Sequence, residues 1–114
     1  MVVKKLVVYI ALLAATAHAG AVSCIGVPKG VSLDGETGDV LVEEISPMRW
    51  ARLCSIRNDA NGITASVCKG YLSALLAAQA SGRSVMTYTR STVECGAHPP
   101  WQFLQGFYFL TLLN

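Results

Sequence analysis

The pattern of apolar and polar residues after position 20 predicts short strands around a single helix. Apolar residues gather in three stretches before residue 57, and a polar or proline-containing turn ends each stretch. We expect strands over 24–33, 40–45 and 49–56. Two further strands are predicted over 85–90 and 107–112.

The segment 67–81 has the composition of a helix, because it is rich in Ala and Leu and contains no proline. Its less polar residues recur at three- and four-residue steps, which places them on one face: Cys68, Tyr71, Leu72, Leu75, Ala78 and Gln79. Ser66 is predicted to cap the first turn, and Gly82 to end the helix in a left-handed conformation.

The order strand-strand-strand-helix-strand-strand predicts a mainly β domain over 20–114. This order is that of the OB-fold, a small Greek-key barrel whose helix lies between the third and fourth strands. A barrel would also protect the apolar last strand from having an open edge. The alternative is an open sheet with the helix on one face.

The first 19 residues have the pattern of a secretory signal peptide. Lys4 and Lys5 precede an apolar run of about 12 residues, and Ala17-His18-Ala19 is a small-x-small cleavage site. The run is shorter than the roughly 20 residues that span a bilayer, so we expect no membrane segment after cleavage. An uncleaved anchor is the alternative, and lipidation at Cys24 is a second one. The mature chain is predicted to be secreted or periplasmic.

Four cysteines in a small exported domain predict two disulfides, because the exported space is oxidising. Their spacings of 30, 14 and 27 residues lack the close pairs typical of zinc sites. Four cysteines allow three pairings, and only the topology selects among them. In an OB arrangement strand one runs beside strand four, and strand three ends near the start of the helix. We therefore expect Cys24–Cys95 and Cys54–Cys68.

Composition and charge argue against some classes of function. The chain is 53% hydrophobic and 14% charged, with nine Lys and Arg against seven Asp and Glu. Without Lys4 and Lys5 the charges balance, which argues against nucleic-acid binding. No catalytic constellation is visible, since adjacent Glu43 and Glu44 point to opposite strand faces and His98 is expected in an exposed loop. We predict no enzyme activity, no metal and no cofactor.

Aromatic residues near polar groups are the candidates for binding. Trp50, Tyr88 and Trp101 offer ring faces, and Arg90 lies two residues from Tyr88. Ring faces stack on the C–H faces of sugars, and an arginine binds a carboxylate such as that of a sialic acid. The alternative is that Trp50 and Tyr88 belong to the core and that Trp101 closes one end of the barrel.

A resemblance rests on the stretch CKGYLSALLAAQASGRSV over 68–85, together with Cys95 and Trp101. This stretch resembles small secreted bacterial proteins of uncharacterised function. Its passage from helix to strand is also similar to the B subunits of AB5 toxins of the subtilase-cytotoxin type. The toxin resemblance implies an OB-like fold and a pentamer that binds cell-surface glycans, although no complete sugar-binding motif of that family can be matched here.

Two functions remain open from the sequence. The first is an exported module that binds a glycan and forms a ring like a toxin B subunit. The second is a disulfide-stabilised structural or protein-interaction domain without a small-molecule site.

Overall fold

The computed structural model describes residues 21–114, so the predicted signal peptide lies outside the described residues. The described chain forms six strands, one long helix and a short 3-10 turn. In chain order these are β1 (Val22–Gly26), β2 (Lys29–Leu33), β3 (Asp39–Ile45), β4 (Met48–Ser55), α2 (Ala65–Ser81), β5 (Val85–Thr89), η3 (Cys95–Ala97) and β6 (Phe107–Leu112). Neither helical segment is long and apolar enough to cross a membrane.

The strands form two three-stranded antiparallel sheets. Sheet A has the order β1-β5-β6 and sheet B the order β2-β3-β4. The stretch expected as one strand over 24–33 is in fact two, because buried Pro28 interrupts it and its halves pair with different partners, β5 and β3. The prediction of a mainly β fold with one helix is confirmed, whereas the number of strands was one too low.

The two sheets do not close into a continuous barrel within the described residues. Between β4 and the segment before β6, the ladder is reduced to an isolated parallel bridge that joins Arg52 to Phe103. Backbone hydrogen bonds from Arg52 N to Gln102 O and from Leu104 N to Arg52 O accompany this bridge. Segment 101–104 therefore covers the free edge of β4 without forming a strand, and the predicted closed barrel is replaced by two facing sheets.

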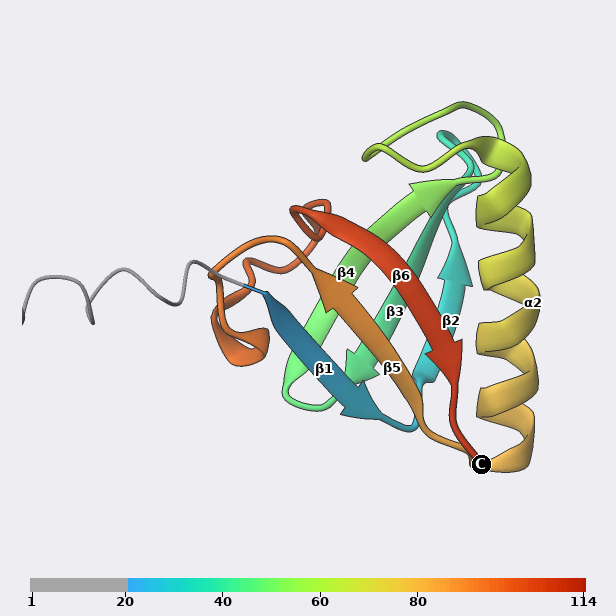
Figure 1. The fold of residues 1–114 in the computed structure, drawn as a ribbon. Coiled ribbons are helices and arrows are strands. Elements are labelled where there is room, and N and C mark those ends of the chain that lie inside the picture. The colour runs from blue at the N-terminus through green and yellow to red at the C-terminus, as the bar shows by residue number, and fades with distance from the viewer. Residues whose placement is uncertain (1–20) are drawn as a thin grey trace, which may run out of the picture.

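Helix α2 runs along one side of the sheets and contacts β2, β4 and β6 (Figure 1). Its N-cap is Thr64, whose hydroxyl accepts from Val67 N, so the helix begins two residues before the predicted start and Ser66 is not the cap. Gly82 ends it in the left-handed conformation, as predicted. Gln79 Oε1 accepts from Val31 N at 2.9 Å, which satisfies part of the outer edge of β2.

The core lies between the sheets and under α2, and two disulfides join its parts. Cys24 is bonded to Cys95 and Cys54 to Cys68, which confirms both predicted pairs. Cys24, for which lipidation was the alternative, is thus a disulfide partner. The inner faces contribute the remaining core residues, including Val40, Val42, Ile45, Leu53, Leu75, Val85 and Phe107. Two disulfides indicate an oxidising environment, extracellular or periplasmic.

Candidate functional site

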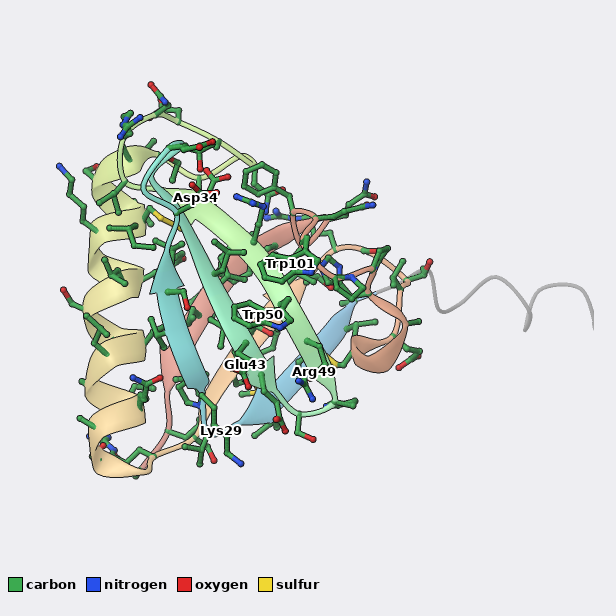
Figure 2. The ribbon with its side chains drawn as sticks, turned by 180° about the vertical axis from the view of Figure 1, so that it is seen from behind. Lys29, Asp34, Glu43, Arg49, Trp50 and Trp101 are labelled. Atoms are coloured by element: carbon green, nitrogen blue, oxygen red, sulfur yellow. A yellow bond between two sulfur atoms is a disulfide. The ribbon has the colours of Figure 1, made fainter. Side chains whose placement is uncertain are left out.

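Trp50 and Trp101 stack on each other on the outer face of sheet B. Their ring centroids are 4.4 Å apart and their planes differ by 13°. Figure 2 shows both rings lying over β3 and β4, on the face turned away from the core. Trp101 is 54% exposed, and Trp50 is half-buried. The pair is therefore a flat aromatic surface open to solvent.

Both tryptophans have a left-handed backbone, with φ of 48° at Trp50 and 70° at Trp101. Within residues 21–114, Asn61 is the third non-glycine residue with positive φ. Such conformations are costly for bulky side chains and concentrate at ligand sites. A hydrogen bond of 2.7 Å from Trp101 N to Trp50 O ties the two backbones together. The strained conformation is what allows strand β4 and a distant loop to present their rings side by side.

The chain places Trp50 on the outer face through the pairing of β3 with β4. Val42 lies opposite Ala51, and both face the core, so Glu43 and Trp50 turn outward together. Leu41, opposite Arg52, is only 3% exposed although it also points outward. It shares the lining of one hollow with both tryptophans, which indicates that the aromatic pair covers it.

Arg52 binds Trp101, the member of the aromatic pair that lies in the loop before β6. Its Nε donates to the backbone oxygen of Trp101 at 2.8 Å, and its Nη1 donates to Asp39 at 2.7 Å and to Asp34 at 3.1 Å. The backbone N–H of Glu36 and then the Arg52 side chain lower the pKa of Asp34 below its usual value. The Asp34 carboxylate is therefore ionised at neutral pH, and the guanidinium of Arg52 is already engaged by two acidic side chains.

Two hollows flank Trp101 and Arg52. The first has a volume of about 330 Å³ and an apolar side, lined by Ser32, Leu33, Asp34, Leu41, Trp50, Arg52 and Trp101. The second has a volume of about 540 Å³ and is richer in amides, lined by Thr37, Asp39, Arg52, Asn61, Trp101, Gln102, Phe103 and Gln105. Both volumes lie in the range of about 300–1,000 Å³ common for small-molecule sites.

The structure separates the four predicted binding residues into two places. Tyr88 lies in β5 of sheet A and Arg90 directly follows that strand, so neither belongs to the tryptophan pair. Tyr88 meets Phe109 edge-on at 5.4 Å, and the guanidinium carbon of Arg90 lies 3.9 Å from the centre of the Tyr108 ring. A shallow hollow of about 230 Å³ lies among Tyr88, Tyr108 and Phe109. The guanidinium of Arg90 beside this second aromatic surface is stacked on the Tyr108 ring.

His98, expected in an exposed loop, is instead 7% exposed. Its Nε2 lies 3.0 Å from Gln102 O, an acceptor, so Nε2 carries the proton in the neutral ring. Burial lowers the pKa of His98 below its usual value. The ring therefore supports the loop that carries Trp101 and lines a neighbouring cavity of about 190 Å³. Among the described residues, no three His, Cys, Asp or Glu side chains gather as a metal site would require.

Sequence reasoning missed Arg52, Asp34, Asp39 and Asn61. Arg52 could have been found, because residues two apart on a strand share a face and Trp50 was already a candidate. Asn61 precedes Gly62 in a loop, and asparagine tolerates the left-handed conformation better than most residues. The contact between Trp50 and Trp101 has no local signal, because it depends on how loop 95–106 folds back over β4.

The chain matches no protein-family model, no curated protein and no solved structure. The similarity of segment 68–85 to toxin B subunits therefore stays a prediction.

Proposed function

We propose that this chain is an exported, non-enzymatic module of OB-like architecture that binds a carbohydrate on the surface formed by Trp50 and Trp101. The parallel bridge between Arg52 and Phe103, which joins β4 to the segment before β6 where a barrel would close, supports the OB-like arrangement. The two disulfides support export, in agreement with the signal-peptide pattern of the first 19 residues.

One observation carries the binding proposal: two tryptophans, both in a left-handed backbone, are stacked on the solvent side of a sheet. Burial in the core gives no reason for this arrangement, since Trp101 is 54% exposed. A folded chain retains such strain where the surrounding structure and a function maintain it. A wide, rigid indole face is suited to a ligand with a flat apolar side.

Sugars have the complementary chemistry. The face of an indole ring carries partial negative charge, which attracts the weakly positive axial C–H groups of a pyranose. Polar groups around the pair would then orient the hydroxyl groups. Half-buried Glu43 lies across from Trp50 on the neighbouring strand, where its carboxylate is an acceptor for hydroxyl donors.

A glycan array that compares the wild-type chain with Trp101→Ala tests this function. We expect the wild-type chain to bind a defined set of glycans and the variant to lose at least tenfold in affinity while keeping its fold. Leu76→Ala is the matched control, because Leu76 is a 46% exposed apolar residue on α2, away from sheet B's outer face. A wild-type chain that binds no glycan would contradict the proposal, and so would a Trp101→Ala variant that binds as wild type does.

A second candidate is a protein-interaction domain that uses the outer face of sheet A. Strands β1, β5 and β6 contain no charged residue, and Ile25 and Phe109 are 53% and 46% exposed on them. An apolar face of this kind is typical of a contact surface, and copies of the chain joined there could form a ring. Native mass spectrometry of wild type and of Phe109→Thr tests it: an oligomer that the substitution dissociates supports this candidate, and a wild-type monomer contradicts it.

A further inference from the structure

The two hollows beside Trp101 share two lining residues and differ in the rest. Trp101 and Arg52 line both of them, whereas Trp50 lines only the first and Asn61 only the second. A single sugar ring stacked on Trp101 would leave at least one hollow empty. The surface is thus longer than a monosaccharide needs.

All three non-glycine residues with positive φ in the described chain line these hollows: Trp50, Asn61 and Trp101. The left-handed backbone is therefore not confined to the aromatic pair but also occurs at a residue that lines the second hollow. Asn61 is held there by two hydrogen bonds of 2.9 Å, in which Nδ2 donates to Leu53 O and Leu104 O. Its Oδ1 remains an acceptor at a fixed position.

The two hollows differ in chemistry. Leu33, 49% exposed, and Leu41 give the first hollow an apolar wall suited to the C–H side of a sugar ring. The second hollow has the exposed side-chain amides of Gln102 and Gln105, which both donate and accept hydrogen bonds. Such amides can form hydrogen bonds with the hydroxyl groups of a sugar.

The charges on the lining disfavour an acidic ligand. Arg52 is the single cation lining either hollow of the described chain, and its Nη1 is hydrogen-bonded to both Asp34 and Asp39. One positive and two negative charges leave the lining with a net charge of −1. An anionic sugar such as a sialic acid would meet repulsion here, and a neutral one would not.

We propose, building on the function proposed above, that the ligand is a neutral oligosaccharide that lies across Trp101 and places sugar rings in both hollows. The chain then recognises several consecutive units of a glycan, with Leu33 contacting one part and Gln102 and Gln105 another. Recognition of a chain differs from recognition of one terminal sugar in that affinity grows with length.

The experiment uses an array of neutral and sialylated glycans of one to six units, followed by titration of the best glycan and its shorter fragments with tryptophan fluorescence as the readout. We expect neutral glycans of three or more units to bind at least tenfold more tightly than their mono- and disaccharide fragments. Binding confined to single terminal sugars or to sialylated glycans would overturn the inference while leaving the proposed function intact. Absence of all binding would overturn both.

Two substitutions test the hollows separately. Leu33→Ala and Gln105→Ala change exposed side chains, so the fold should be retained, which circular dichroism verifies. We expect each to weaken binding of the longest glycan at least threefold, and by a larger factor than it weakens binding of the monosaccharide. Leu76→Ala should bind all glycans as the wild type does. If either hollow variant binds the longest glycan with wild-type affinity, that hollow holds no sugar and the inference is wrong.

Discussion

The Nε of Arg52 donates a hydrogen bond of 2.8 Å to the backbone oxygen of Trp101. This bond joins a side chain of β4 to the loop residue that forms the more exposed half of the aromatic pair. The same guanidinium binds Asp34 and Asp39 on the opposite side. One half-buried arginine therefore links the turn after β2, the start of β3 and the loop before β6, and it fixes the position of Trp101.

Replacing Arg52 by Ala should destabilise the fold and release Trp101. The change removes three hydrogen bonds and leaves Asp39, which is 7% exposed, without its cation. We expect the free energy of unfolding to fall by about 2–3 kcal/mol, the scale for hydrogen bonds to charged groups. Urea denaturation measures this loss, and a change in tryptophan fluorescence reports the loss of the stacked pair.

Arg49→Ala is the matched control for this arginine. Arg49 is 55% exposed in its side chain and makes one ion pair of 3.9 Å with Glu44. Exposed pairs of this kind contribute about 0–1 kcal/mol, so the variant should unfold nearly as the wild type does. Equal losses in the two variants would show that Arg52 does not have the specific role described here.

Gly30→Ala and Gly70→Ala should change stability in opposite directions. Gly30 has a φ of +61°, and a Cβ there would lie 2.5 Å from the Cβ of Glu43, so the two strands would have to move apart. We expect a loss of more than about 1 kcal/mol. Gly70 lies inside α2 with nothing near its missing Cβ, so alanine should add about 1 kcal/mol through helix propensity. Thermal unfolding compares the two, and a neutral Gly30→Ala would contradict the close approach.

The parts of the fold with a periodic pattern were predictable from the sequence. The bounds of β6 were predicted correctly, and the helix prediction differed only by its first two residues. Both disulfides were predicted from the order of the strands, and the structure keeps that order although the barrel does not close. The pattern of apolar residues predicts one strand over 24–33, whereas Pro28 separates β1 from β2 and the two belong to different sheets.

The candidate site was predictable only in part. The sequence predicts Trp50 and Trp101 as binding residues, but their contact depends on a left-handed backbone at both. A tryptophan in a sequence does not indicate that conformation, because bulky residues rarely adopt it. Tyr88 and Arg90 lie close in sequence to each other and do share a face, yet that face belongs to the other sheet. The sequence predicts an exposed His98 because two prolines follow it in a loop; the structure exposes Pro99 and Pro100 but buries the histidine ring.

Removing the Cys54–Cys68 bridge by a double substitution to Ala should lower the free energy of unfolding by about 3 kcal/mol, because the bridge closes a loop of 14 residues in the unfolded chain. Peptide mapping without reduction checks the pairing directly. Cleavage after Arg52, Arg57 and Lys69 should yield peptide 53–57 linked to peptide 58–69. Either peptide linked to one that contains Cys24 or Cys95 would contradict the structure.

Acidification should destabilise the fold through His98. Burial keeps the pKa of His98 in the folded state below the ordinary value of about 6.5 that applies in the unfolded chain. As the pH falls below that ordinary value, the unfolded chain binds a proton at His98 and the folded chain does not. The free energy of unfolding therefore decreases progressively until the pH reaches the folded-state pKa. His98→Gln keeps a side-chain N–H donor for Gln102 O but has no titrating ring.

Urea denaturation between pH 7.5 and 5 measures this effect. We expect the wild-type chain to lose more stability than His98→Gln over this interval, and the difference between them isolates the histidine because every other titrating group is common to both. Parallel pH profiles for the two proteins would show that His98 already accepts a proton in the folded state, and the buried neutral ring described here would be wrong.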